Sequence, residues 1–209
     1  MAQTKLIQCG TDNCYIVSEG EDAILVDTGT AAFFDKVLAE CSAYKMRLIF
    51  LTHPHFDHAE NAAALSERFG VPVAMSADDL GIFDSYDTQP LRSYGIVGKV
   101  VLALSIKPLR GTKVGKPQNL VFVKDGDSLA DYGIDAKVLS LPGHTNGSMG
   151  LDVEGRDLLV GDELDNWLAP AVGHLYCDRD ALRRSAEKIR SLGARTIFYG
   201  HGKPTQNRT

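Results

Sequence analysis

Four side chains of the metal-binding types lie within six residues of one another, and they are His53, His55, Asp57 and His58. Imidazole and carboxylate groups at this density are what zinc, iron or manganese sites need. In an extended segment alternate side chains point the same way, which predicts that His53, His55 and Asp57 converge while His58 turns away. Pro54 favours an extended conformation at His53. The segment is therefore predicted to bind metal, and its geometry suits two ions.

Apolar strands carry Asp or His side chains at their ends elsewhere in the chain. The residues at these strand ends are Asp27, His144, Asp162 and His201. Each has Gly, Pro or Thr close by, so that a rigid sheet would carry the side chain and a tight turn would aim it. Five of the six histidines fall at such strand ends or in the 52–58 segment, and only His174 is left over. For Asp27 the alternative stays open that Asp and Gly simply terminate a strand.

The 53–58 segment, His-Pro-His-Phe-Asp-His, resembles the His-x-His-x-Asp-His motif of the metallo-β-lactamase fold superfamily. Four further matches stand in that family's order along the chain: Asp27 in Asp-Thr-Gly, His144 in Gly-His-Thr, Asp162 in Gly-Asp and His201 in Gly-His-Gly. The resemblance covers nearly the whole sequence. It identifies a superfamily of many chemistries and not a substrate.

The resemblance also implies how the ligands divide between two divalent metal ions. One ion would be bound by His53, His55 and His144. The second would be bound by Asp57, His58 and His201, with Asp162 and a hydroxide ion bridging both. Zinc is the first expectation, and iron or manganese suit the same mixed set of ligands.

Two local expectations concern the surroundings of these ligands. Asp27, Thr52 and Thr145 are placed in the sequence to hydrogen-bond the ligating imidazoles. Asp57 followed by Glu60 has the spacing of a helix start, and residues 61–69 would form the body of that helix.

The elements that must position these residues are readable from hydrophobic periodicity. A β-meander up to Val26 precedes an amphipathic helix over Ala31–Ala43 and a buried strand over Leu48–Leu51. Strands between about 120 and 160 precede a helix over Asp178–Leu192 and a last strand over Thr196–Tyr199. Two β-rich halves, each followed by helices, predict an α+β fold, a four-layer αβ/βα sandwich, as the resemblance also implies. With 209 residues, 44% of them hydrophobic, we expect one domain over 1–209.

Three features of the sequence indicate where in the cell the protein is expected. The N-terminus lacks a charged leader followed by an apolar stretch, so we expect a cytoplasmic protein. The four cysteines show no Cys-x-x-Cys pairing, and we expect reduced, buried thiols. The longest apolar run, Ile96 to Ile106, is interrupted and too short to cross a bilayer, so no membrane association is expected.

A basic segment separates the two halves. Leu91 to Gln118 holds six Lys or Arg residues and no Asp or Glu, in a chain of net charge −5. We expect a helical insertion at about 84–118 that caps the site and offers positive charge to a small anionic substrate. The alternatives are a solvated edge or a contact in a homodimer. His174, with Trp167 and Tyr176, is expected near the same pocket, although a lone histidine is more often structural.

The implied chemistry is hydrolysis by a bridging hydroxide on a dinuclear metal centre. Such a centre lowers the pKa of bound water to about 7 and polarises the oxygen that gains charge. We expect attack on an ester, thioester or lactone carbonyl, with Asp57 orienting the nucleophile and helping to move its proton. Asp57 as a ligand and Asp162 as a bridge look more like the glyoxalase II and lactonase branches than like β-lactamases, so hydroxyacyl-thioester hydrolysis comes first.

Other functions stay open at this point. They are a lactonase, a phosphodiesterase or nuclease of the same superfamily, and a non-enzymatic scaffold or sensor domain that merely holds metal. Nucleic acid is disfavoured because no aromatic residues interleave with the basic ones. A purely structural metal site would be closed by four ligands, which argues against the scaffold.

Overall fold

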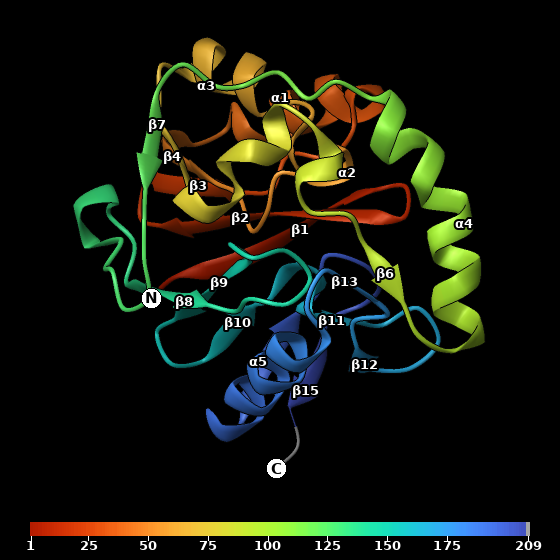
Figure 1. Cartoon of the computed structure of the whole chain (residues 1–209). Coiled ribbons are helices and arrows are strands. Elements are labelled where there is room, and N and C mark those ends of the chain that lie inside the picture. Colours follow the sequence, from red (N-terminus) through yellow and green to blue (C-terminus); the bar gives the residue numbers. More distant parts are fainter. Residues whose placement is uncertain (208–209) are drawn as a thin grey trace.

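Two β-sheets stacked face to face form the centre of the molecule (Figure 1). The computed structural model describes residues 1–207. The first sheet has the order β1-β2-β3-β4-β5-β7, and its strands are β1 (Gln3–Cys9), β2 (Asp12–Glu19), β3 (Asp22–Val26), β4 (Lys45–Phe50), β5 (Val73–Met75) and β7 (Leu120–Phe122). The first three strands run antiparallel, as the predicted meander requires, and β3, β4, β5 and β7 run parallel to one another.

The second sheet comes from the C-terminal half of the chain. Its order is β15-β14-β10-β9-β8, and its strands are β8 (Ala136–Ser140), β9 (Met149–Val153), β10 (Asp157–Leu159), β14 (Arg195–Phe198) and β15 (Thr205–Asn207). A core between the sheets draws Phe50 and Tyr15 from one sheet and Leu151 and Phe198 from the other. Burial of these side chains removes apolar surface from water and holds the two halves together.

Helices cover the outer face of each sheet. The helices are α1 (Phe34–Cys41), α2 (Phe56–Ala59), α3 (Ala62–Phe69), α4 (Gly95–Gly111) and α5 (Arg179–Ser191). In Figure 1, α1 and α3 lie above the first sheet and α5 lies below the second. A separate apolar cluster underlies each group, with Val37 and Leu65 on one side and Ile189 on the other. The four-layer αβ/βα sandwich predicted from the sequence is therefore confirmed.

Local signals account for several element ends. Asp178 caps α5, because its Oδ1 accepts hydrogen bonds from the backbone N–H groups of Asp180 (2.9 Å) and Ala181 (3.0 Å). Gly70 ends α3 in the left-handed conformation at φ 67°. The helix expected over Ala31–Ala43 begins as a 3₁₀ turn, Ala31–Phe33, and continues as α1. The other 3₁₀ turns are Ala77–Phe83, Tyr86–Thr88, Ala130–Tyr132 and Gly161–Glu163.

The segment between the halves forms one long helix, α4, at the edge of the sandwich (Figure 1). Just before it, β6 (Arg92–Ser93) pairs with β13 (Leu175–Tyr176), which ties α4 to the C-terminal half. A second small pair joins β11 (Leu164–Asp165) to β12 (Ala171–Val172). These two-residue strands are too short to leave a periodic pattern in the sequence. Within residues 1–207, no helix has the length and apolarity needed to cross a membrane.

Candidate metal centre

The predicted metal-binding segment leaves the first sheet at the end of β4. Helix α2 begins at Phe56, one residue before the predicted start, and Asp57 does not cap it. The extended conformation therefore stops at His55. The prediction that Asp57 converges with His53 and His55 while His58 turns away is wrong, because helical turns replace the alternation of a strand.

The structure brings all seven predicted ligand residues into one cluster. Three groups have donor atoms that all lie within 4.8 Å of one another: His53 with His55 and His144; His53 with His58 and Asp162; Asp57 with His58 and His201. The first and third groups have the same members as the two ligand sets that the resemblance implies. Asp162 lies between them, with Oδ2 3.7 Å from His144 Nε2 of the first group and 3.2 Å from His201 Nε2 of the third.

The cluster fits a pair of cations. The Nε2 atoms of His53 and His58 and the Oδ1 atom of Asp162 are buried and have no hydrogen-bond partner among the described residues. Leaving buried polar atoms unpaired costs free energy, and coordination to a cation would remove that cost. His55 Nδ1 and His144 Nε2 face each other at 3.0 Å, as two ligands of one ion would. That these residues bind metal stays a prediction.

Asp27 holds the ligand segment from behind. Its backbone is in the left-handed region at φ 56°, which is uncommon for residues other than glycine. Its Oδ1 accepts from the Thr52 backbone N–H (2.8 Å), and its Oδ2 accepts from the Thr52 hydroxyl (2.8 Å) and faces His58 Nδ1 at 2.9 Å. The Thr52 hydroxyl lies 3.1 Å from His53 Nδ1. The predicted contacts of Asp27 and Thr52 with the imidazoles of His58 and His53 are therefore confirmed.

Thr145, the third predicted orienting residue, does not contact an imidazole. The prediction for Thr145 is wrong, because its hydroxyl donates to Asp79 Oδ2 at 2.6 Å instead. The Nδ1 atom of His144 instead lies 3.0 Å from the Leu175 carbonyl oxygen. Asp79 also accepts from the Gly147 backbone N–H at 2.8 Å, so it fixes the turn that carries His144. No sequence signal singled out Asp79.

The last ligands depend on close backbone packing. A Cβ atom on Gly200 would lie 2.2 Å from Asp162 Oδ1 and 2.8 Å from His58 Cε1, so only glycine fits there. His201 Nδ1 lies 3.1 Å from the Thr11 carbonyl oxygen, and its ring stacks on Trp167 with centroids 4.7 Å apart. Trp167 was expected near the pocket, and this stacking interaction places it there.

Burial and neighbouring charges divide the imidazoles into two kinds. Burial lowers the pKa of His53 and of His144, which favours their neutral, ligand-ready form. Burial alone would also lower the pKa of His201, but the Asp162 and Asp57 carboxylates outweigh it and raise the pKa to about 9. A cation that replaces the proton on such an imidazole finds its carboxylate partners already in place.

The cluster opens into a cavity of about 640 Å³. Asp57, His144, Asp162 and His201 lie on its floor, and α4 contributes Val101, Leu104, Pro108 and Leu109 to its wall. Among the described lining residues there is no Lys or Arg. Helix α4 turns apolar side chains toward this cavity, and the expectation that the basic segment offers positive charge to a substrate stays a prediction. Trp167 and His174 line it as predicted, and Tyr176 does not.

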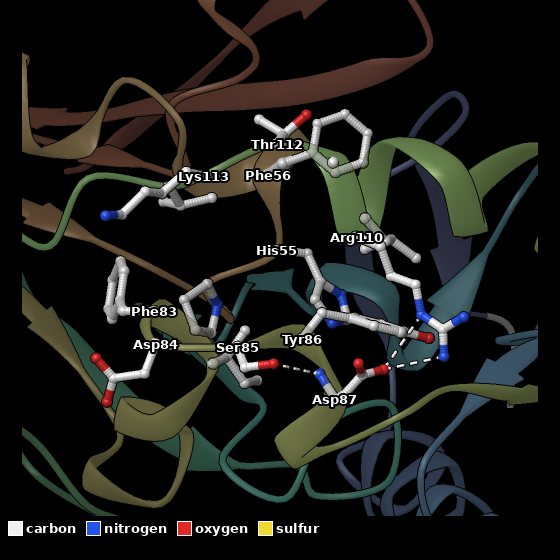
Figure 2. Close-up of a pocket in the computed structure, with 15 residues that line it drawn as sticks. His55, Phe56, Phe83, Asp84, Ser85, Tyr86, Asp87, Arg110, Thr112 and Lys113 are labelled. Carbon is white, nitrogen blue, oxygen red and sulfur yellow. Dashed lines mark hydrogen bonds and ion pairs between the residues drawn. The ribbon is translucent and has the colours of Figure 1, made fainter.

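Part of the basic segment faces a different hollow, of about 390 Å³, shown in Figure 2. Arg110 and Lys113 line it together with His55 and Tyr86. Arg110 Nη2 is paired with Asp87 Oδ1 at 3.0 Å. This hollow lies beside the metal centre and shares His55 with it, but it does not contain the other predicted ligands.

Comparison with known proteins agrees with the geometry. The chain is 28% identical over 208 residues to an uncharacterized protein of Mycobacterium tuberculosis, covering 92% of this chain and 87% of that protein. A probable metallo-hydrolase of Methanocaldococcus jannaschii is 26% identical over 202 residues, with 92% and 88% covered. Hydroxyacylglutathione hydrolase 1 of Vibrio vulnificus is 26% identical over 197 residues, and the match covers 90% of this chain but 60% of that enzyme.

Among solved structures, the crystal structure of TTHA1623 in a di-iron-bound form superposes with a TM-score of 0.70 at 26% identity, covering 98% of this chain and 94% of that one. A family model described as the metallo-beta-lactamase superfamily matches residues 8–201. Since that match spans nearly the whole chain, the protein belongs to the metallo-β-lactamase superfamily.

Proposed function

We propose that the protein uses two divalent cations to hydrolyse ester or thioester bonds of small molecules. The observation that carries the proposal is the open cluster: two groups of three ligands, with Asp162 between them, at the floor of one cavity. The proposal is consistent with membership of the metallo-β-lactamase superfamily and with residues grouped so that they could hold metal ions. An open position beside the ligands is what distinguishes catalytic from structural metal sites, which disfavours the scaffold and sensor alternatives.

The residues divide the work. His53, His55 and His144 would hold one cation, and Asp57, His58 and His201 the other, with Asp162 between them. When bound, such a pair lowers the pKa of water to about 7 and polarises a carbonyl. Asp57 Oδ2 lies 3.6 Å from His201 Nε2, which leaves its other oxygen to orient the attacking water and accept its proton.

Thioesters are the first substrate class. Support comes from the likeness to the Vibrio hydroxyacylglutathione hydrolase, although this chain spans only 60% of that enzyme. Lactones are the second class, and the apolar wall contributed by α4 favours them when they carry an aliphatic side chain. Phosphodiesters and nucleic acids are disfavoured, because no Lys or Arg of the described residues lines the cavity. In this cavity, the positive charge that attracts an anionic substrate would come mainly from the two metal ions.

Metal content and a substrate panel test the proposal together. Protein purified without added metal should contain close to two metal ions per chain by elemental analysis. Zinc is the first expectation, and iron is the second because TTHA1623 was crystallised in a di-iron-bound form. The activity of protein reconstituted with zinc is therefore compared with that of protein reconstituted with iron. The panel pairs lactoylglutathione with an acyl-homoserine lactone, bis-nitrophenyl phosphate and a cephalosporin.

The matched control is His55→Ala purified in the same way, which removes one ligand and guards against contaminating hydrolases. We expect thioester or lactone turnover by the wild type that is lost in the control. A chain that binds two metals but turns over only the phosphodiester or the cephalosporin contradicts the proposed bond class. A metal-free chain contradicts the proposed mechanism.

A further inference from the structure

His174 is the histidine that the predicted metal centre does not use. It lies directly before β13, and its Nδ1 atom is 2.5 Å from Asp165 Oδ2. Its backbone N–H donates to the same carboxylate oxygen at 3.1 Å. Asp165 is 4% exposed, and its other oxygen has no hydrogen-bond partner among the described residues. The contact fixes the Nδ1–H form of the ring and leaves Nε2 free.

The backbone on either side of His174 touches the metal centre. A Cβ atom on Gly173 would lie 2.2 Å from the Asp162 carbonyl oxygen, and the Gly173 N–H donates to the Glu163 carbonyl at 2.9 Å. On the other side, the Leu175 carbonyl oxygen lies 3.0 Å from His144 Nδ1. His174 and Asp165 line the same cavity as the predicted ligands. The pair is therefore held beside the centre and opens into the space that a substrate would fill.

The imidazole ring is held in one orientation. The ring of Tyr94 stacks on it with centroids 5.5 Å apart and planes 13° apart, and the Arg179 guanidinium lies over Tyr94 at 5.0 Å. Helix α4 packs directly behind, since a Cβ atom on Gly98 would lie 3.0 Å from the His174 carbonyl oxygen. Ordered packing of this kind around an Asp–His pair supplies the preorganisation that proton transfer needs.

Stability alone gives a poor account of the pair. Burial raises the pKa of Asp165, so the buried carboxylate is costly even with His174 beside it. Replacing such a pair with apolar side chains of similar size is often neutral or stabilising. An Asp–His pair that faces a cavity next to a catalytic centre has the arrangement of a proton donor or acceptor.

We propose that His174, oriented by Asp165, is a catalytic residue that protonates the leaving group. The inference rests on the proposed hydrolase function. After water has added to the carbonyl carbon, the bond from that carbon to the leaving oxygen or sulfur breaks. His174 enters this step as an imidazolium, with Nδ1–H donating to Asp165 and a second proton on Nε2. The leaving atom takes the bonding electron pair and that Nε2 proton, so an alcohol or thiol departs instead of its anion. The neutral imidazole then regains a proton from solvent.

Leaving-group dependence tests the proposal. The substrates are esters that share one acyl group and differ in the basicity of the leaving alcohol, from an alkyl alcohol to para-nitrophenol. His174→Asn keeps a donor where Nδ1–H stands and removes Nε2. General acid catalysis contributes about 10²- to 10⁴-fold, so we expect kcat/KM to fall about 100-fold for the alkyl ester. For the nitrophenyl ester, whose leaving group needs no proton, we expect a change below about 3-fold.

Two comparison variants separate a chemical role from a structural one. Asp165→Asn should show the same leaving-group dependence as His174→Asn, because it removes the group that orients the ring. Tyr94→Phe keeps the stacked ring and loses only the hydroxyl that donates to the Val172 carbonyl (2.8 Å), so it should affect all esters alike. Metal content should equal that of the wild type in all three. A loss in His174→Asn that is uniform across the esters, or no loss at all, overturns the proposal.

A readout without turnover completes the test. In zinc-reconstituted protein labelled with ¹⁵N-histidine, the resonance that is missing from His174→Asn should show a proton on Nδ1, and Asp165→Asn should shift it. A His174 ring protonated only on Nε2 contradicts the inference even if the enzyme is active. If the wild type hydrolyses none of the esters, thioesters or lactones, the proposed function itself fails, whatever the NMR spectrum shows.

Discussion

The two sides of the cavity differ in what fixes their side chains. On the metal side the five histidines among the predicted ligands are buried, and second groups hold some of them, as Asp27 holds His58 and Thr52 holds His53. On the α4 side the contacts are apolar and partly open to water, and Leu104 is 74% exposed although it lines the cavity. We therefore expect the geometry of the metal side to tolerate little change, and the α4 side to change shape with little loss of stability.

This contrast separates chemistry from selectivity. Hydrogen bonds to buried groups specify direction, so the metal side supports one arrangement of ligands. Apolar contacts are non-directional, so the α4 side can accept substrates of different shape. Substitutions on the metal side should therefore abolish activity on every substrate, whereas substitutions on α4 should change which substrate is preferred.

The largest effect is expected for Asp162→Ala. Without this carboxylate between the two ligand groups, the protein should bind one cation fewer and lose about 10³-fold or more in kcat/KM on all substrates. Elemental analysis and steady-state kinetics measure both quantities, with Asp131→Ala at an exposed position as the control. Loss of both cations, or of neither, would show that Asp162 does not bridge them.

Asp27→Ala should weaken metal binding through His58. Orienting groups of this kind contribute about 10- to 100-fold to metal affinity. Trp167 is the only tryptophan in the chain and stacks on His201, so its fluorescence should report cation binding in a titration. Asp27→Asn, which tolerates the left-handed backbone, should recover part of the stability but little of the affinity. Equal affinity in the wild type and in Asp27→Ala would contradict the role of this carboxylate.

Asp79→Ala should destabilise the turn that carries His144. The change leaves the Gly147 N–H, the Thr145 hydroxyl and the Gln89 amide without their acceptor, which costs about 1–3 kcal/mol of unfolding free energy. Denaturant unfolding measures it. The neighbouring Asp78 is exposed, so Asp78→Ala is the matched control and should change stability little. Similar values for the two variants would remove Asp79 from the support of the metal centre.

The smallest effects belong to α4. Leu104→Ala removes an apolar lining group and should raise KM about 5-fold for a lactone with an aliphatic chain, with kcat little changed. Lys99→Ala and Lys107→Ala lie on the same helix but line no part of the cavity, and they should change KM by less than about 2-fold. A large rise in KM for lactoylglutathione in the lysine variants would instead support the charged cap expected from the sequence.

The same contrast limits what sequence reasoning could find. Asp27, the 53–58 segment and the two-layered strand pattern follow from residue types and spacing that are local in the chain. Asp79 contacts a turn that lies 68 residues further along the chain, so local spacing does not reveal it. Asp165 and His174 lie in or beside two-residue strands, which leave no periodic signal. The basic composition of α4 was visible, but its orientation was not, because a helix with apolar residues around most of its surface does not show which side will be covered.

The amino-acid sequence by itself determined the sandwich, the set of side chains available for metal and the class of chemistry they suit, because hydrophobic alternation and donor type are properties of short segments. Only the tertiary structure decided that the extended conformation stops at His55, that α4 turns apolar side chains to the cavity, and that His174 pairs with Asp165. Each of those outcomes depends on where a strand stops, how a helix rotates or which backbones approach, and these are fixed by packing between distant parts of the chain.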